Sequence, residues 1–237
     1  MSPEARPAAA SSLLARLLSP DSSLPLAEVA RTRLSVHYET GRDDVPVLCV
    51  CTPDAVRLPP GLVTTVLPTG TARVRSGVLE TGSRRWPVTR WWRPARLHGM
   101  APPAGVPDVD GVDVPDSVEP AALLGRGPGL TPAGDDVLAG ALVTAHAVGD
   151  PRLTGWRRQT RAALAGGATT AVSRALLQHA ADGWAVPQLA AFVAAACAGD
   201  PTPAVGPLLA VGHTSGAALA GGALHVLGTA AGVRRAA

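Results

Sequence analysis

The sequence predicts an α+β fold, in which a small antiparallel sheet or barrel in the N-terminal half is followed by a bundle of about six helices. In the first half, short runs rich in Val and Thr alternate with turn residues, a pattern typical of β-strands. In the second half, runs rich in Ala, Leu and Gly end at helix-capping residues. The change of pattern falls in a segment rich in Pro, Gly and Asp.

Composition divides the chain into four regions. Residues 1–30 contain Pro, Ser and Ala around one short Leu-rich helix candidate, and are expected to form an N-terminal arm. Residues 31–98 are expected to be the β-rich region, and residues 99–118 a linker. Residues 119–237 are expected to form the helical bundle. Strands are expected at residues 34–38, 45–51, 61–67, 72–79 and 85–92.

All basic residues of the chain are arginines, because the sequence contains no lysine. A pyridoxal phosphate Schiff base and a Walker-type nucleotide site both need a lysine, so both are excluded. The pI near 9.2 is compatible with nucleic-acid binding. However, the net charge is only +3, and one Tyr and one Phe leave little material for base stacking. We therefore expect no nucleic-acid partner.

Cysteines and targeting signals also limit the function. The cysteines are Cys49, Cys51 and Cys197, too few for a disulfide framework. Cys49 and Cys51 would share one face of a strand, and we interpret them as packing thiols because no second Cys/His pair stands at zinc-site spacing. The N-terminus shows no secretory pattern, so a cytoplasmic location is expected. Residues 201–233 lack Asp, Glu and Arg, but their prolines favour two buried helices over a membrane span, and no membrane partner is expected.

Residues 125–136 form the motif with the most chemical content, Gly-Arg-Gly-Pro-Gly-Leu-Thr-Pro-Ala-Gly-Asp-Asp. Thr131 is expected to cap a helix, with Pro132 as its first residue. The glycines let backbone amides approach a ligand, and a helix start favours an anion. The residues expected to bind in this way are Gly127, Gly129, Thr131 and Gly134.

The two aspartates that end the motif allow two interpretations. Asp135 or Asp136 would act as a base or orient a metal, for which magnesium is the ion considered. Alternatively, both merely complement the helix dipole at a surface-like position, while Thr131 caps the helix. Because they lie about 100° apart on a helix, one is expected to be functional and the other supportive.

A second turn, at residues 212–216, reads Gly-His-Thr-Ser-Gly and also precedes a helix of small residues. The two turns resemble each other weakly, so we expect both helix starts to face one site. His213 is either an acid, a base or a hydrogen-bond donor in this site, or a structural residue, and the expected binding residues are Thr214, Ser215 and Gly216. Between the two turns, Thr170 and Ser173 offer hydroxyls to a ligand or cap a helix. Valine at Gly129 or Gly216 is expected to weaken ligand binding more than stability.

Residues 125–136 resemble the signature of the AllH-like domain-of-unknown-function family, which includes a subunit of bacterial oxamate carbamoyltransferase. Thr169 and Thr170 with Ser173, and the turn at residues 212–216, support the resemblance. The family commonly carries an acidic residue shortly after this turn, where the present sequence has Ala217 and Ala218. The resemblance implies a subunit that acts with partner proteins on a small carboxylate or carbamoyl metabolite, with phosphate as an option.

Two functions from different classes follow for this motif. In the first, the chain is a transferase or transferase subunit whose amides and hydroxyls hold an anionic acyl or carbamoyl group. In the second, it is a non-catalytic partner or ligand-sensing subunit of a multiprotein enzyme, with the reacting residues on another chain. The sequence shows no obvious nucleophile with an adjacent base, which supports the second function.

Overall fold

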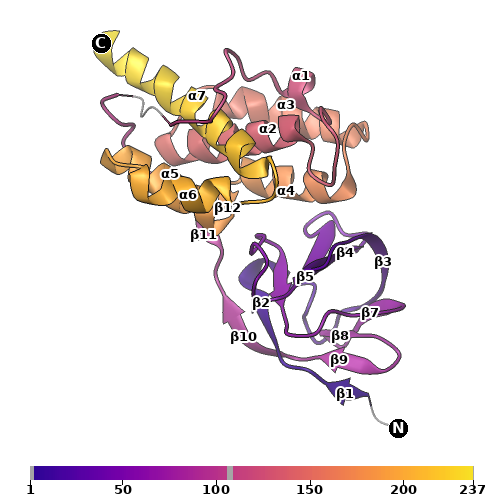
Figure 1. The fold of residues 1–237 in the computed structure, drawn as a ribbon. Helices are drawn as coiled ribbons and strands as arrows, with labels where there is room; N and C mark the ends of the chain where they lie inside the picture. Colours follow the sequence, from indigo (N-terminus) through magenta and orange to yellow (C-terminus); the bar gives the residue numbers. More distant parts are fainter. Residues whose placement is uncertain (1–2, 106–108, 237) are drawn as a thin grey trace. The chain divides into compact units, whose positions relative to one another are not determined.

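The computed structural model describes residues 3–105 and 109–236 and divides into two compact units, the first ending at Pro94 and the second beginning at Ala95 (Figure 1). The first unit contains one large curled sheet, and the described part of the second contains seven helices. The predicted α+β class is therefore confirmed. Each unit is described by itself below.

The sheet of the first unit has ten strands in the order β1-β9-β8-β7-β3-β4-β5-β6-β2-β10. Most neighbours are antiparallel, as expected, but β1 with β9, β2 with β10, and β5 with β6 are parallel. The strands are β1 Glu4–Ala5, β2 Ala8–Ser11, β3 Ser23–Arg31, β4 Ser35–Glu39, β5 Val47–Cys51, β6 Gly61–Val63, β7 Ala72–Arg75, β8 Val78–Glu80, β9 Arg84–Trp86 and β10 Val88–Trp92.

The two ends of this sheet meet along one parallel ribbon. The β1–β2 segment runs beside the β9–β10 segment, and the Arg6 and Ala8 amides donate to the Arg85 and Pro87 carbonyl oxygens at 2.8 and 3.0 Å. Because β9 lies next to β8 at one end of the order and β2 next to β6 at the other, this ribbon closes the sheet on itself. Of the two predicted arrangements, the structure adopts the barrel, which leaves few exposed strand edges.

Residues 3–30, which were predicted to form an N-terminal arm, belong to this sheet instead. They form β1, β2, a 3-10 helix at Ser12–Leu14 and most of β3. Leu14 and Leu17 are fully buried and belong to the core of the first unit. The sequence pattern did not predict β2, because this strand reads Ala-Ala-Ala-Ser, which has little β-propensity. Pairing on both sides and burial of the adjacent leucines make it a strand.

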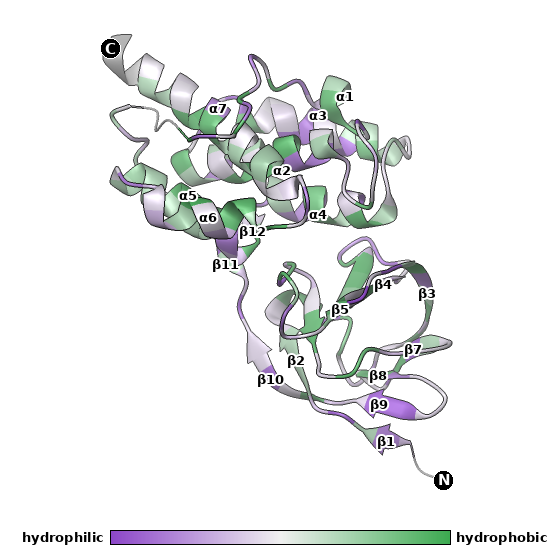
Figure 2. Cartoon of the chain, in the orientation of Figure 1, coloured by the Kyte–Doolittle hydropathy of each residue, from purple (hydrophilic) through white to green (hydrophobic). Residues whose placement is uncertain are grey.

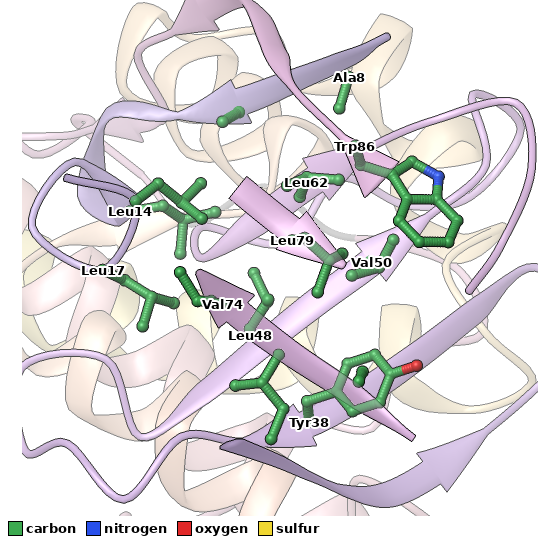
Figure 3. Packing of buried hydrophobic residues seen from close by; sticks show 14 of the residues in the cluster. Ala8, Leu14, Leu17, Tyr38, Leu48, Val50, Leu62, Val74, Leu79 and Trp86 are labelled. Atoms are coloured by element: carbon green, nitrogen blue, oxygen red, sulfur yellow. The ribbon is translucent and has the colours of Figure 1, made fainter. Parts of the chain in front are cut away.

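The barrel core is built mainly from strand side chains, together with Leu14 and Leu17 from the segment that follows β2 (Figure 3). Tyr38, Leu48 and Val50 from β4 and β5 pack with Leu79 and Trp86, and all five are fully buried. The Trp86 indole N–H donates to the Val66 carbonyl oxygen at 3.0 Å, which satisfies its polar atom inside the core.

The strands of the barrel differ in polarity. β5 is coloured as hydrophobic and β9 as hydrophilic in Figure 2. All five residues of β5 are buried, including Cys49 and Cys51, which were expected to be packing thiols.

The second unit is built around α2, which packs closely against α7 (Figure 1). A Cβ atom at Gly140 would lie 2.1 Å from the Leu219 carbonyl oxygen, and one at Gly222 would lie 1.9 Å from the Val137 carbonyl oxygen. Only glycine permits this approach of the two backbones. The elements are β11 Ala95–Arg96, α1 Pro120–Leu123, α2 Ala133–Val148, α3 Leu153–Ala165, α4 Ala171–Ala181, β12 Trp184–Ala185, α5 Pro187–Ala198, α6 Thr202–Leu209 and α7 Ser215–Ala236.

The predicted linker, residues 99–118, has no helix or strand in its described parts, 99–105 and 109–118. It nevertheless packs on the helices as part of the second unit. The Met100 amide donates to the Ala147 carbonyl oxygen at 2.8 Å, and His225 Nδ1 lies 2.8 Å from the Pro115 carbonyl oxygen. The segment is therefore a strap across α2 and α7.

Residues 201–233, whose apolar composition raised the question of a membrane span, form α6 and most of α7. Across the described ranges, none of the helices combines the length and the hydropathy that crossing a bilayer requires.

Candidate functional site

The glycine-rich loop, residues 125–132, leads into α2 and is anchored by Asp135. The Gly125 amide donates to Asp135 Oδ1 at 2.7 Å, across ten residues of chain. Gly125 has a φ of +73°, and a Cβ atom there would lie 2.1 Å from the Ala168 carbonyl oxygen. The loop can therefore approach the segment before α4 only with glycine at this position.

Asp135 is a buried anchor rather than an exposed dipole partner. It is 1% exposed, and its Oδ2 accepts hydrogen bonds from the hydroxyls of Thr169 and Ser173, the latter at 2.6 Å. Together with the Gly125 amide, these donors use both carboxylate oxygens. We infer that Asp135 ties the loop, α2 and the start of α4 together, a role that the sequence did not show for Thr169.

Thr170 and Ser173, the two expected binding hydroxyls, are occupied within the protein. The Thr170 hydroxyl donates to the Leu130 carbonyl oxygen at 2.7 Å and accepts from the Ser173 amide at 3.0 Å as the N-cap of α4. Ser173 is 2% exposed, and its hydroxyl donates to Asp135. Of the two alternatives stated for these residues, the structure therefore supports anchoring and capping.

Asp136, the next residue along α2, has a different environment. It is 7% exposed, and its Oδ2 is buried without a hydrogen-bond partner. Burial raises the pKa of this carboxyl group to about 6, and the negative charge of Asp135 adds to the rise. Hydrogen bonding from the hydroxyls of Ser215 and Thr131 acts in the opposite direction and lowers this pKa. Neither hydroxyl donates to Oδ2. Asp136 is thus a buried acid whose charge the protein compensates only in part.

Thr131 and Ser215 bring the two helix starts together. Their hydroxyl oxygens lie 3.2 Å apart, which joins the loop before α2 to the first residue of α7. The two turns that the sequence singled out therefore lie side by side. Thr131 is not the N-cap of α2, however, because that position is Pro132 and no side chain caps the helix. Its hydroxyl is consequently available for Ser215.

Three of the amides in the first turn of α2 already have acceptors within the protein. The Gly134 amide donates to the Arg126 carbonyl oxygen at 2.9 Å, and the amides of Asp135 and Asp136 donate to the Pro132 carbonyl oxygen. In the part of the chain that the structure describes, the amides of Gly127 and Gly129 have no acceptor. The available donors are thus the amides of Gly127 and Gly129 in the loop and, among the described residues, the amide of Ala133 at the first residue of α2.

The glycines of the motif divide into two groups. A Cβ atom at Gly134 would lie 2.1 Å from the Leu123 carbonyl oxygen, and one at Gly216 would lie 2.0 Å from the Leu208 carbonyl oxygen. Both therefore serve close packing, so a valine at Gly216 would disturb folding first. Gly127 is more open, with Ala133 N at 3.1 Å, and Gly129 has nothing within 4 Å. Gly129 is the position where the backbone is most accessible to a ligand.

The remaining predicted residues lie at the surface. His213 and Thr214 are exposed, and the side chains of both are without a hydrogen bond among the described residues. His213 therefore makes no hydrogen bond to Asp136 among the described residues. Within the described ranges, no three His, Cys, Asp or Glu side chains gather in a group able to hold a metal. Both oxygens of Asp135 already accept hydrogen bonds, which limits what it can offer a magnesium ion.

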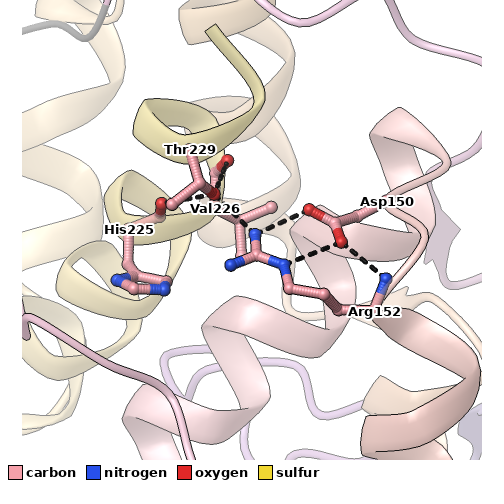
Figure 4. Close-up of polar contacts among 5 residues, drawn as sticks. All are labelled: Asp150, Arg152, His225, Val226 and Thr229. Atoms are coloured by element: carbon pink, nitrogen blue, oxygen red, sulfur yellow. Dashed lines mark hydrogen bonds and ion pairs between the residues drawn. The ribbon is translucent and has the colours of Figure 1, made fainter. Parts of the chain in front are cut away.

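A second polar cluster joins α7 to the turn between α2 and α3 (Figure 4). The Arg152 guanidinium donates to both oxygens of Asp150, at 2.9 and 2.7 Å, and to the Thr229 hydroxyl at 2.5 Å. Burial opposes ionisation of Asp150, but the hydrogen bonds from Arg152 outweigh it and hold the pKa below its usual value. Arg152 also stacks over Trp156, 4.7 Å from the ring centre. Because these groups satisfy one another, we interpret the cluster as structural.

The two units define an α+β protein. Its helical unit carries a glycine-rich loop that is held by the buried Asp135, and the next residue, Asp136, is a buried aspartate with one oxygen that lacks a hydrogen-bond donor. Residues 123–227 match the family described as oxamate carbamoyltransferase subunit AllH. The match includes Asp135, Asp136 and Ser215 and most of the helical unit, but less than half of the 237 residues. It confirms that this unit is AllH-like. No solved structure matches the chain.

Proposed function

We propose that the chain is a subunit of a carbamoyltransferase-type enzyme, and that its helical unit binds a small carboxylate or carbamoyl compound beside Asp136. The family description supports the class of enzyme and the presence of partner subunits. The observation that carries the proposal for the site is the buried, unpartnered Oδ2 of Asp136. It lies in the region where the loop meets α7.

An unsatisfied buried carboxylate oxygen is costly for folding. Leaving such an acceptor without a donor costs about 1–3 kcal/mol, and more when the group is charged. Asp135, one residue earlier, shows that this fold can supply three donors to a carboxylate. Strongly perturbed carboxyl groups with incomplete hydrogen bonding are characteristic of functional sites. We therefore assign the ligand-contacting role to Asp136 and the supporting role to Asp135.

The neighbouring groups supply the other contacts of the proposed site. The hydroxyls of Thr131 and Ser215 lie next to Asp136, and the free amides of Gly127 and Gly129 are donors for a carbonyl or carboxylate oxygen. His213 and Thr214 are exposed at the turn before α7. With its pKa near 6, Asp136 is suited to act as a base close to neutral pH. Partner subunits would supply the remaining reacting groups.

The proposal is tested by assaying phosphate-dependent carbamoyl transfer with oxamate-type substrates, first for the purified chain and then with the products of neighbouring genes. We expect activity with the partner subunits and a loss of at least about a hundredfold in Asp136→Asn. The matched control is Asp182→Asn, which makes the same chemical change at a side chain that is 50% exposed. Full activity of Asp136→Asn, or no transfer in any combination, would contradict the proposal.

A further inference from the structure

We infer that Asp136 selects ligands by their N–H groups, so that the site prefers an amide or carbamoyl end of a ligand over a carboxylate end. This inference rests on the proposed function and specifies which chemical group of the ligand meets the buried carboxylate.

The first argument is the hydrogen-bonding capacity of Asp136. An ionised carboxylate only accepts hydrogen bonds, so its buried Oδ2 is satisfied by a ligand that donates. A carboxylate ligand has no hydrogen to donate, whereas an amide or carbamoyl NH₂ has two. A site with an unpaired polar group discriminates strongly against ligands that lack the complementary group.

The second argument is charge. Asp135 and Asp136 are consecutive, and the charge of Asp135 adds to the burial that disfavours ionisation of Asp136. Among the described residues, the ion pairs include no partner for either aspartate, and the sequence contains no lysine. An anionic group placed against Oδ2 would therefore face two carboxylates that no arginine pairs with among the described residues, which works against its binding there.

The third argument is the pairing of donors and acceptors. The Thr131 and Ser215 oxygens are 3.2 Å apart, longer than an ordinary O–H···O hydrogen bond, so a ligand can replace this contact at little cost. An amide carries an acceptor and a donor on adjacent atoms. Its oxygen would accept from one of these hydroxyls while its N–H donates to Oδ2. A carboxylate end of the same ligand would point toward the free amides of Gly127 and Gly129.

Three probes of nearly equal size separate these effects: oxamide with two amide ends, oxamate with one, and oxalate with none. Calorimetric titration of the full chain at pH 7.5, alone and with partner subunits, should give Kd values for oxamate and oxamide at least about tenfold lower than for oxalate. In Asp136→Asn the new NH₂ group donates to carboxylates. The variant should therefore bind oxalate at least as tightly as oxamate.

The outcomes distinguish the two proposals. If wild-type protein binds oxalate as tightly as oxamate, or if Asp136→Asn keeps the wild-type order, the selection by N–H groups is wrong while the binding site stands. If none of the three probes binds in either preparation, the proposed function fails and the inference fails with it. A melting curve of Asp136→Asn shows whether the variant is folded. If the variant is unfolded, the order of the three Kd values in the wild-type protein decides the inference by itself.

Discussion

The Ser173 hydroxyl of α4 lies 2.6 Å from Oδ2 of Asp135 on α2, and this hydrogen bond links two helices through a side chain that is 1% exposed. One residue further along α2, Asp136 has no such partner for its own Oδ2. Of these two adjacent carboxylates, one has hydrogen-bond donors for both oxygens and the other leaves one oxygen without a donor. Mutation of each residue can therefore separate their roles.

Asp135→Asn should destabilise the protein. The amide NH₂ of asparagine cannot accept from either the Gly125 amide or the hydroxyls of Thr169 and Ser173, so at least one buried donor loses its acceptor. We expect a loss of about 2–4 kcal/mol in the free energy of unfolding, measured by urea denaturation. The control Asp182→Asn, at an exposed position, should stay within about 0.5 kcal/mol of wild type. Equal stability of the two variants would show that Asp135 anchors nothing.

Asp136→Asn should make the protein more stable than wild type near neutral pH. This advantage should disappear at acid pH. The pKa of Asp136 is raised from 3.8 to about 6, so the folded state holds this proton more tightly than the unfolded state does. Stability from this group is fully present below about pH 4 and is lost as the pH rises through about 6. A difference of about 2 in pKa corresponds to roughly 3 kcal/mol, an upper estimate of the advantage of the variant at pH 7.5.

The measurement is urea denaturation of wild type and Asp136→Asn at pH 4 and at pH 7.5. Other groups titrate in both proteins, so only the difference between the two reports on Asp136. A difference that is the same at both pH values would mean that the carboxyl group carries no burial cost. A variant less stable than wild type at pH 7.5 would show that Asp136 is an anchor as well.

Alanine at Gly129 and at Gly216 should have contrasting effects. At Gly216 the new Cβ would meet the Leu208 carbonyl oxygen at 2.0 Å, so the backbones must separate and stability should fall by about 2–4 kcal/mol. Gly129 has open space, and its φ of +100° limits the cost to about 1–3 kcal/mol of backbone strain. Melting temperatures and oxamate titration of both variants test this. A larger stability loss at Gly129 than at Gly216 would contradict the packing assignment.

Arg152→Ala should weaken the attachment of α7. It leaves the Asp150 carboxylate, 4% exposed, without its cation and removes the hydrogen bond to Thr229. Because the Arg152 side chain is itself 35% exposed, water can replace part of the interaction, and we expect a loss of about 1–2 kcal/mol. Arg161→Ala, which breaks a 3.4 Å pair between exposed side chains, should cost less than about 0.5 kcal/mol. Equal losses in urea denaturation would show that burial of Asp150 is irrelevant.

Much of the architecture could be predicted from local patterns. The Val- and Thr-rich runs identified β4, β5, β6, β9 and β10, and the run at residues 72–79 contains both β7 and β8, separated by the turn at Ser76 and Gly77. Gly149 and Gly199 end α2 and α5 in the left-handed conformation, as glycine stops are expected to do. These features depend on neighbours in the sequence, which is why sequence patterns report them.

The sequence by itself determined the α+β order, the family resemblance and the residues gathered around the motif, because each depends on local propensity or on residue identity. Tertiary structure alone decided that the N-terminal residues close the barrel, since their partners lie about 80 residues away. It also decided that Gly134 and Gly216 serve packing, and that Asp135 is satisfied while Asp136 is not. Burial and hydrogen-bond partners arise from contacts between distant segments, and no local pattern encodes which of two adjacent aspartates receives the donors.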